Sequence, residues 1–230
     1  MWLILVMIII LLSLMIYGLV PTLLYRVLNR NFRNTRTNQN IYLTFDDGVD
    51  EKYTKEVLRV LKENNIPATF FVVANFAEKH PALISNIKSD GHIIGLHSLS
   101  HKNEILQTPW NIKNDFSKSM DILKKLGVKP KFFRPPWGHF SLSGIKEFKS
   151  LDLTPVLWNI IVGDWKANIT SEEIANRLLE KTEMGDIICL HDGRGKNEAP
   201  KRTVEALEIV IPIWKSRGFT FGTLEELYEY

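Results

Sequence analysis

Residues 41–48 read Ile41-Tyr-Leu-Thr-Phe-Asp-Asp-Gly48, an apolar stretch that ends in two adjacent carboxylates. β-Branched and aromatic residues dominate its first five positions, which predicts a buried strand over Ile41–Phe45. Neighbouring carboxylates repel each other, and a bound cation that neutralises one would let the other stay ionised beside it as a base. A simple turn is the alternative, since Asp-Asp-Gly is also favourable turn chemistry.

Strand-like and helical segments alternate along the chain after residue 40. The other apolar runs that predict strands are Ala68–Val73, His92–Leu96, Lys131–Arg134, Pro155–Asn159, Asp186–Leu190 and Gly218–Phe221. Helical periodicity is found over Tyr53–Asn64, Ala82–Ser89, Pro109–Leu126, Ser141–Ser150, Thr170–Lys181, Pro200–Ser216 and Thr223–Tyr228. Such alternation predicts an α/β fold, a parallel sheet covered by helices that is either open or closed into a barrel.

Polar clusters follow five of the predicted strands. In order they are Asp46-Asp47, His97 with His101, Arg134, Asp164 and His191-Asp192. Ligands of such folds gather at the carboxyl ends of the strands. The sequence therefore predicts one site at this rim of the sheet.

The segment His97-Ser-Leu-Ser-His101 places two imidazoles four residues apart, a spacing that would put both on one face of a helical turn. Two histidines and one carboxylate with an open position form the ligand set of a catalytic zinc or a related divalent ion. A chance pair on the surface is the alternative. Only six histidines occur in the chain, and these two share the predicted rim with Asp46-Asp47, which favours a metal site.

The segment Arg134-Pro-Pro-Trp-Gly138 is stiffened by its two prolines. Its Arg can hold a carboxylate through paired hydrogen bonds, and Trp137 can present its backbone N–H to the site. An ordinary proline-rich turn is the alternative. Near the carboxyl end, Asp164 and His191 suggest a histidine oriented by a carboxylate, which suits a general acid. The other possibility is a core histidine paired with Asp192.

The first 25 residues contain no Asp, Glu, Lys, Arg or His. Trp2–Val20 is long enough to cross a hydrocarbon core of about 30 Å. No early Lys or Arg and no Ala-x-Ala-like cleavage site precede Pro21, so a retained anchor is favoured over a cleaved signal peptide. We therefore predict a transmembrane anchor over residues 1–25, a basic polar tether over 26–40 and one domain over 41–230.

The positive charge of the chain is concentrated just after the apolar segment. Four arginines there contribute +4: Arg26, Arg30, Arg33 and Arg36. The net charge of the whole chain is +3, so the remaining residues sum to −1. A basic collar of this kind binds anionic lipid headgroups and gives no footprint for nucleic acid. By the positive-inside rule the collar favours a domain that faces the cytoplasm. The single cysteine, Cys189, excludes an intramolecular disulfide and a multi-cysteine metal site.

Five motifs in this order resemble the polysaccharide deacetylase family, also called the NodB homology domain or carbohydrate esterase family four. They are Thr44-Phe-Asp-Asp-Gly48, His97-Ser-Leu-Ser-His101, Arg134-Pro-Pro-Trp-Gly138, Asp164-Trp165 and Leu190-His-Asp192. The resemblance runs from about Ile41 to the carboxyl terminus. It implies a distorted (β/α) barrel with fewer than eight strands, here preceded by one transmembrane helix.

The same resemblance implies a metal-dependent removal of N-acetyl groups from amino sugars. Asp47, His97 and His101 would hold the ion, usually Zn²⁺, although Co²⁺ or Ni²⁺ can serve. The other roles it implies are a base (Asp46), an arginine that orients the base (Arg134), an acid (His191) and a carboxylate that tunes the acid (Asp164). Substrate would be bound by the Trp137 backbone N–H and by Trp165 and Leu190 of the acyl pocket.

Three departures from the family pattern lie in or near that pocket. Ile161 stands where another Asp is common, Cys189 stands where a leucine is frequent, and Val49-Asp50 replaces a proline often found after the first motif. None of them belongs to the implied ligands, base or acid, so the departures bear on acyl size and on the identity of the sugar.

Three functions follow from these residues. The first is a membrane-anchored deacetylase outside the cytoplasm that acts on an envelope polysaccharide such as peptidoglycan. The second is a cytoplasm-facing deacylase of a lipid-linked sugar precursor, which the arginine collar favours. The third is an inactive carbohydrate-binding homologue, against which the complete set of ligands, base and acid argues.

Overall fold

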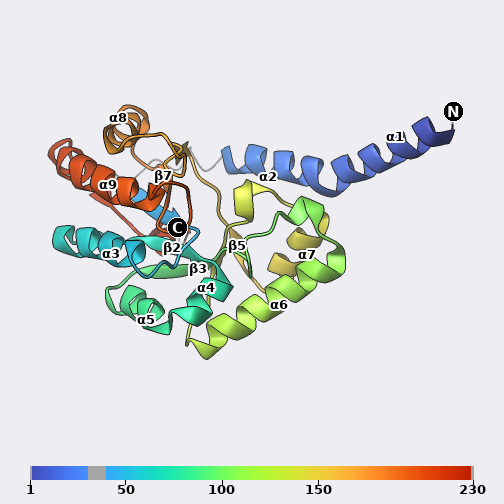
Figure 1. The fold of residues 1–230 in the computed structure, drawn as a ribbon, viewed down its shortest axis with the longest axis horizontal. Helices are drawn as coiled ribbons and strands as arrows, with labels where there is room; N and C mark the ends of the chain where they lie inside the picture. The colour runs from blue at the N-terminus through green and yellow to red at the C-terminus, as the bar shows by residue number, and fades with distance from the viewer. Residues whose placement is uncertain (1, 31–39, 229–230) are drawn as a thin grey trace.

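The computed structural model describes residues 2–30 and 40–228 (Figure 1). Its centre is a parallel sheet with the strand order β5-β4-β3-β2-β1-β7-β6, and β8 pairs with the beginning of β1 off this path. The strands are β1 (Asn40–Asp46), β2 (Thr69–Val72), β3 (Ile93–Leu96), β4 (Phe132–Phe133), β5 (Thr154–Pro155), β6 (Ile160–Ile161), β7 (Ile187–His191) and β8 (Thr220–Phe221). The sheet curls into a half-barrel, which confirms the predicted distorted (β/α) barrel, and its continuous path has seven strands.

Strand β1 occupies the middle of the sheet and is buried on both faces. Leu43 and Phe45 belong to the main core beneath the helices, while Tyr42 faces a second cluster with Phe71 and Ile187. A central parallel strand covered on both sides is built mainly from apolar residues, as Ile41–Leu43 and Phe45 provide here. Its register places Asp46 beside Phe71 of β2 and His191 of β7.

Helices cover the outer face of the sheet (Figure 1). They are α3 (Tyr53–Asn64), α4 (Ala74–Lys79), α5 (Pro81–Ser89), α6 (Pro109–Lys125), α7 (Leu142–Ser150), α8 (Ser171–Lys181) and α9 (Ala199–Ser216), with short 3₁₀ turns η3 (Glu104–Leu106) and η4 (Pro136–Gly138). Helix α10 (Leu224–Tyr228) packs instead on the second cluster through Leu224. Helix α8 begins with a capping box formed by Thr170 and Glu173. The side chains of Thr108 and Ser141 cap α6 and α7, each by accepting a hydrogen bond from one backbone N–H of the first turn.

Two parts of the sequence-based assignment differ from the structure. The predicted strand Pro155–Asn159 is replaced by the short strands β5 and β6 on either side of a bend. The carbonyl oxygens of Val156 and Leu157 in that bend accept hydrogen bonds from the Arg134 guanidinium. A strand ladder cannot use acceptors that a side chain has taken. Helix α4 was not predicted.

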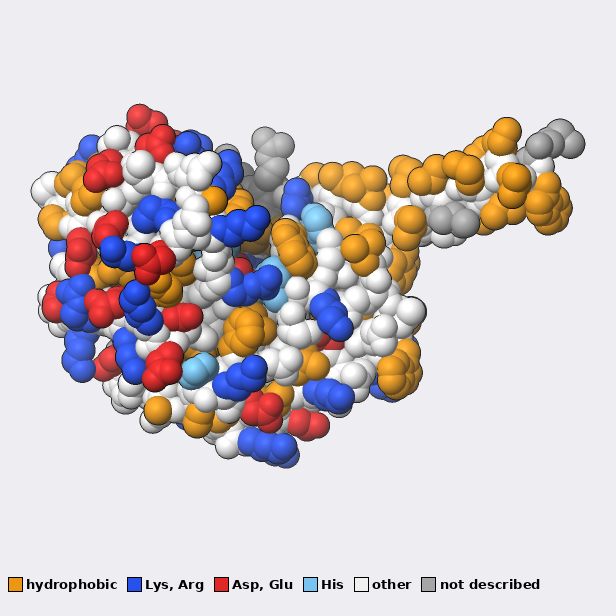
Figure 2. Space-filling view, in the orientation of Figure 1, with side chains coloured by type: hydrophobic (Ala, Val, Ile, Leu, Met, Phe, Trp, Pro, Cys, Tyr) orange, Lys and Arg blue, Asp and Glu red, His pale blue; other side chains and the backbone are white. Residues whose placement is uncertain are grey.

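The N-terminal segment is one continuous helix made of α1 (Trp2–Leu14), a π-helical turn η1 (Met15–Leu19) and α2 (Val20–Arg30). By length and composition Trp2–Val27 could cross a membrane, with 6% of its most apolar window buried. The helix continues through Arg30, so the first part of the predicted 26–40 tether is helical, while residues 31–39 lie outside the described residues. Figure 2 shows hydrophobic side chains at most of the described positions of the projecting part.

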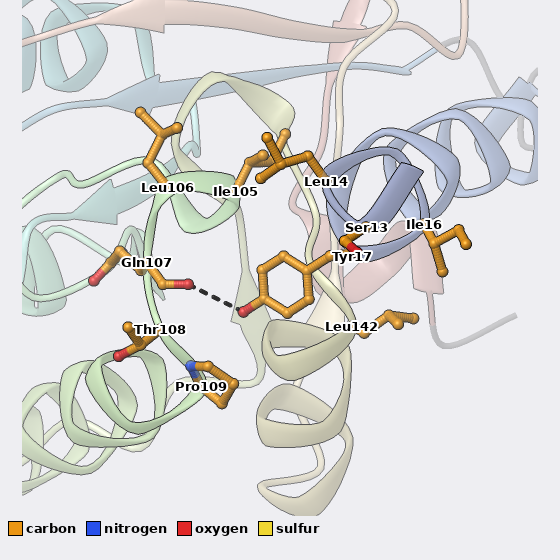
Figure 3. Close-up of a pocket in the computed structure, with 10 residues that line it drawn as sticks. All are labelled: Ser13, Leu14, Ile16, Tyr17, Ile105, Leu106, Gln107, Thr108, Pro109 and Leu142. Carbon is orange, nitrogen blue, oxygen red and sulfur yellow. Dashed lines mark hydrogen bonds between the residues drawn. The ribbon is translucent and has the colours of Figure 1, made fainter. Parts of the chain in front are cut away.

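Helix α2 packs on the domain through specific contacts. Thr22 is buried and its Oγ1 both accepts a hydrogen bond from Phe140 N at 2.9 Å and donates one to Phe140 O at 3.1 Å. The Tyr25 ring stacks on Phe140 with centroids 4.4 Å apart. One turn earlier, Tyr17 donates a hydrogen bond to Gln107 O (Figure 3). The helix is therefore attached to the domain along its second half.

Candidate active site

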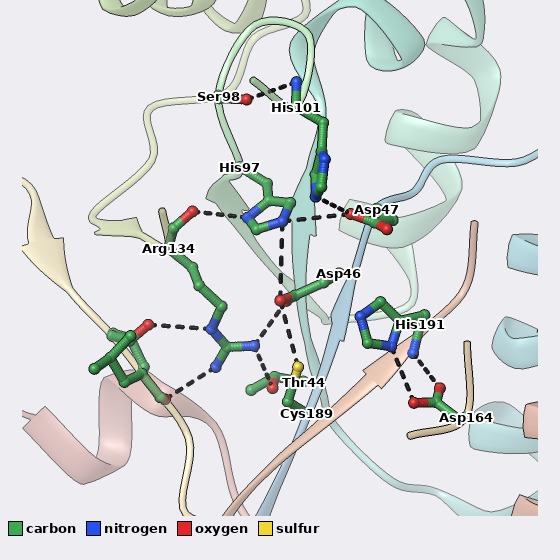
Figure 4. A network of polar contacts seen from close by, with 12 residues as sticks. Thr44, Asp46, Asp47, His97, Ser98, His101, Arg134, Asp164, Cys189 and His191 are labelled. Atoms are coloured by element: carbon green, nitrogen blue, oxygen red, sulfur yellow. Dashed lines mark hydrogen bonds and ion pairs between the residues drawn. The ribbon is translucent and has the colours of Figure 1, made fainter. Parts of the chain in front are cut away.

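The carboxyl ends of the strands bring the predicted polar residues together (Figure 4). Asp46 is the last residue of β1 and His191 the last residue of β7, and these two are register partners. His97 directly follows β3, and Arg134 directly follows β4. Sequence segments up to 145 residues apart thus meet at one rim, as the sequence predicts.

Asp46 is held by Arg134 in the interior of the rim. The guanidinium Nη1 lies 2.7 Å from Asp46 Oδ1 and 2.8 Å from Thr44 Oγ1. The Arg134 side chain is fully buried and also contacts the face of the Phe71 ring. A buried cation with its donors satisfied in this way fixes the position of its carboxylate partner. This arrangement leaves Asp46 Oδ2 facing the cavity side, 3.9 Å from His97 Nε2.

Asp47 lies beside Asp46 and forms a separate group with two histidines. The rings of His97 and His101 both approach Asp47 Oδ1. Asp47 Oδ1 lies 2.8 Å from His101 Nε2 and 3.4 Å from His97 Nε2, and their ligand atoms lie within 4.8 Å of one another. Asp47 Oδ1 is buried and has no hydrogen bond of normal geometry among the described residues. Two imidazole nitrogens and an orphaned carboxylate oxygen at this spacing fit a divalent cation such as Zn²⁺.

A histidine binds a metal ion through a neutral ring nitrogen, and the surroundings of His97 and His101 favour this form in different ways. His97 Nδ1 lies 2.7 Å from the carbonyl oxygen of Arg134, which fixes Nδ1 as the donor and leaves Nε2 free for a ligand. Burial lowers the pKa of His101 and so favours its neutral form. Burial opposes ionisation of Asp47, but its contacts with His101 and His97 hold the pKa of this carboxyl well below its usual range.

The pair does not lie on a helical turn, contrary to the prediction from its spacing. Residues 97–103 form an irregular loop in which Ser98 and His101 have φ values of 68° and 54°. Ser98 Oγ accepts a hydrogen bond from His101 N at 2.8 Å. This local bond closes the loop and brings the His101 ring back beside His97, at a centroid distance of 5.1 Å.

A second group with metal-ligand spacing is formed by Asp46, Cys189 and His191. Asp46 in this group already pairs with the Arg134 guanidinium, and His191 Nδ1 pairs with Asp164. A further cation there would be repelled by the buried guanidinium. The group of Asp47 is therefore the better metal site.

His191 is oriented by Asp164. Asp164 Oδ1 lies 3.0 Å from His191 Nδ1, and Oδ2 accepts hydrogen bonds from His191 N and Thr203 Oγ1. Burial would lower the pKa of His191, but attraction and hydrogen bonding by Asp164, with help from Asp47 and Asp46, raise it to about 9. A histidine of this kind carries a proton at neutral pH and can give it away through Nε2.

These groups line a cavity of about 430 Å³ with apolar and aromatic walls. The Trp137 ring packs on the edge of His101, and the Trp165 ring packs on the edge of His191, so the two tryptophans flank the polar centre. Besides the polar centre, the lining includes Trp137, His139, Trp158, Ile161, Trp165, Cys189, Arg194 and Gly195.

Leu190 does not line this cavity. It is fully buried in the main core, and Cys189 lines the cavity in its place. Side chains alternate along a strand, so the residue two positions before His191 shares its face, and the residue next to it points away. This alternation could have identified Cys189 from the sequence. Trp158 and Arg194 carried no such signal, because a bend and a loop bring them to the cavity.

Comparison with known proteins places the chain among enzymes that act on polysaccharides. The family model described as polysaccharide deacetylase matches residues 33–156. The peptidoglycan-N-acetylglucosamine deacetylase of Bacillus cereus is 33% identical over 199 residues, which cover 86% of this chain and 71% of the relative. The peptidoglycan-N-acetylmuramic acid deacetylase PdaA of Bacillus subtilis is 34% identical over 198 residues, covering 84% of this chain and 73% of the relative.

Two solved structures share the fold. The Bc1960 peptidoglycan N-acetylglucosamine deacetylase, in complex with 4-naphthalen-1-yl-N-oxidanyl-benzamide, is 32% identical with a TM-score of 0.79, over 84% of this chain and 90% of that one. A family 4 acetyl xylan esterase from Clostridium thermocellum, in complex with a cobalt ion, is 37% identical with a TM-score of 0.73, over 82% and 90%. This chain therefore belongs to the polysaccharide deacetylase family.

Proposed function

We propose that this chain is a membrane-anchored, metal-dependent deacetylase that removes N-acetyl groups from the amino sugars of peptidoglycan. The observation that carries the proposal is the separation of two adjacent carboxylates into two roles. Asp46 pairs with Arg134 and stays outside the group formed by Asp47, His97 and His101. The names of the relatives from Bacillus cereus and Bacillus subtilis support peptidoglycan as the substrate.

Asp47, His97 and His101 would hold the ion, as Zn²⁺, Co²⁺ or Ni²⁺. When bound, such an ion polarises the amide carbonyl and lowers the pKa of a coordinated water towards about 7. The cobalt ion in the esterase from Clostridium thermocellum supports a divalent metal in this family.

The side chains around this group supply the proton transfers of amide hydrolysis. Asp46 takes a proton from the attacking water, whose oxygen forms a bond to the carbonyl carbon of the N-acetyl group. The Trp137 backbone N–H donates to the negative carbonyl oxygen that develops. His191 then gives its proton to the sugar nitrogen as the C–N bond breaks, which releases acetate and a free amine.

Trp165 and Cys189 would bound the acyl group, since both line the cavity beside His191. Trp137 is 49% exposed and Trp165 is 39% exposed, so each presents a partly open ring at the mouth of the cavity. Sugar rings pack against open aromatic faces of this kind. We expect a single N-acetyl group to enter the cavity while the rest of the glycan lies across the two tryptophans.

The N-terminal helix would hold the enzyme at the cell membrane with the domain outside the cytoplasm, where peptidoglycan is found. A second possibility is a domain that faces the cytoplasm and acts on a lipid-linked sugar precursor. The arginine collar, of which Arg26 and Arg30 lie in α2, favours this second orientation. An alkaline phosphatase fusion at the carboxyl terminus distinguishes the two, because this reporter is active only after export.

Acetate release from N-acetylglucosamine oligomers and from peptidoglycan fragments tests the activity. The full chain should release acetate and leave fragments lighter by one acetyl group in a mass spectrum. Asp46→Asn should lower turnover by about 10²–10⁴-fold, the usual contribution of a general base. Asp152→Asn is the matched control, since Asp152 is exposed in a distant turn. Equal turnover by the wild type and by Asp46→Asn would contradict the proposal.

A further inference from the structure

An open groove of about 720 Å³ separates the projecting helix from the domain (Figure 3). Leu14, Ile16 and Tyr17 line its helical side, and the segment 105–109 with Leu142 lines its domain side. The groove therefore lies at the level of helix residues 13–17, before the helix reaches its polar end. The medium that surrounds helix residues 13–17 therefore also contacts the edge of the domain that lines the groove.

Three large apolar side chains are exposed at that edge. Leu106 is 81% exposed, Trp110 is 73% exposed and Leu142 is 50% exposed. They belong to the last residue of η3 and to the first turns of α6 and α7, so three separate elements contribute. We call these three residues the juxtamembrane patch. Scattered exposed apolar residues are ordinary. Here Leu106 and Leu142 line the groove beside the apolar helix, and Trp110 follows Pro109, which lines it as well.

The length of the helix brings this patch to the membrane. Residues 2–12, which precede the groove, rise about 16 Å at 1.5 Å per residue. A hydrocarbon core is about 30 Å thick, so the free part of the helix crosses only about half of it. The remaining apolar residues up to Val20 run beside the domain. The domain edge at their level must then face lipid.

Charge around the patch suits a lipid surface. Between His101 and Ser117 the exposed charged side chains are Lys102 and Lys113, while Glu104 and Asp115 are buried. An edge that exposes cations and hides its carboxylates is attracted to anionic headgroups. Tryptophan near such an edge is typical of the membrane–water interface.

We infer that the domain itself docks on the lipid bilayer through Leu106, Trp110 and Leu142, in addition to being anchored by the helix. The inference rests on the proposed membrane anchor. Docking also brings the cavity close to the membrane surface, because Arg26 of α2 donates a hydrogen bond to the carbonyl oxygen of Trp137, which lines the cavity. Arg26 lies about 9 Å along the helix axis beyond Val20.

Site-directed labelling of the full chain tests the docking. The natural Cys189 is buried, so a new exposed cysteine can be labelled selectively with an environment-sensitive fluorophore. Ile8→Cys reports on the anchor, Leu106→Cys on the patch, and Ile209→Cys on α9 is the matched apolar control with 39% exposure. Each labelled protein is placed in nanodiscs of phosphatidylethanolamine and phosphatidylglycerol that contain nitroxide-labelled lipid.

Quenching by the nitroxide lipid at positions 8 and 106, with none at 209, is the expected result. Trp110→Cys should behave like Leu106→Cys, which guards against a local effect of one substitution. Quenching at position 8 alone would overturn the docking and leave the anchor intact. An unquenched label at position 8 would overturn the anchor and the docking together. Acetate release is measured separately, so a failure of the deacetylase proposal leaves these outcomes readable.

Discussion

Arg134 and Asp46 form a buried ion pair in which Nη1 lies 2.7 Å from Oδ1. Thr44 Oγ1 receives a second hydrogen bond from the same Nη1, and the carbonyl oxygens of Val156 and Leu157 receive one each from Nε and Nη2. The guanidinium therefore joins β1 to the bend between β5 and β6. Its planar set of donors, as well as its charge, fixes the carboxylate that we propose as the base.

Replacement of Arg134 by lysine should impair turnover while the charge is kept. A lysine has no planar fork and cannot reach Asp46, Thr44 and both carbonyl groups at once, so Asp46 should move. A displacement of about 1 Å costs about 10²-fold in rate. Bound metal, measured by mass spectrometry, should be unchanged because Arg134 touches the ligands only through its carbonyl oxygen. Arg59→Lys on the surface of α3 is the control, and full activity of Arg134→Lys would refute the positioning role.

Removal of the ion should abolish acetate release, and restoration with Zn²⁺ or Co²⁺ should recover it. His97→Ala and Asp47→Ala should lose both metal content and activity, because each removes one of three converging ligands. Asp46→Asn should lose activity and keep the metal. His80→Ala, at the start of α5, is the matched histidine control. The assignment of roles fails if Asp46→Asn and His97→Ala lose the same amount of metal.

Asp164→Asn should shift the alkaline limb of the pH profile of kcat to lower pH. A general acid works only while it is protonated, so activity falls as the pH rises through the pKa of His191. Attraction by Asp164 helps to raise that pKa to about 9 against the opposing effect of burial. Asparagine removes the attraction, and its amide can also favour the wrong imidazole tautomer. Asp121→Asn, at an exposed site, is the control and should leave the alkaline limb where it is in the wild type. If the limb also stays in place in Asp164→Asn, His191 is not the acid.

The fold could be predicted largely from local pattern. The run Ile41–Phe45 and the helix Tyr53–Asn64 are nearly the segments that the structure contains, because apolar periodicity and burial act in the same direction there. The bend at residues 155–159 could not be predicted. Its backbone acceptors are taken by Arg134, which lies more than twenty residues earlier, and no local pattern reports such a contact.

Part of the site could also be predicted from the sequence, and part of it could not. Asp46, Asp47 and His191 could be placed together because residues after parallel strands share a rim. The loop that returns His101 to His97 depends on a serine hydrogen bond and two left-handed residues, which the spacing alone reports as a helical turn. The docking of α2 through Thr22 and Tyr25 depends on tertiary contacts that composition does not reveal.

Glu104→Gln should change the dependence of stability on pH. Burial raises the pKa of Glu104 to about 8, against the smaller opposite effect of its hydrogen bonds from Ser141. The folded pKa exceeds the unfolded value of about 4.5, so the favourable contribution is complete below that pH and is lost as the pH rises to about 8. Glutamine does not ionise and keeps an acceptor for Ser141. As the pH rises through this range, the free energy of unfolding of the variant should therefore increase relative to that of the wild type. The increase is at most about 1.4 kcal/mol for each unit by which folding raises the pKa of Glu104.

Chemical denaturation at several pH values between about 5 and 8 measures this difference. Glu180→Gln on the exposed face of α8 should follow the wild type throughout. A difference between Glu104→Gln and the wild type that stays constant with pH would show that folding does not raise the pKa of Glu104.

Thr22→Val tests whether α2 is part of the domain. Valine matches threonine in shape but cannot pair with Phe140, so a buried N–H and a buried C=O would each lose a partner. Each unsatisfied group costs about 1–3 kcal/mol, and the thermal transition of the domain should fall accordingly. Because Trp137 and His139 of the same segment line the cavity, KM for an N-acetylated oligosaccharide should also rise. Ser13→Ala removes an exposed hydroxyl from the same helix and should change neither quantity. If Thr22→Val also leaves both unchanged, the helix is not an element of the catalytic domain.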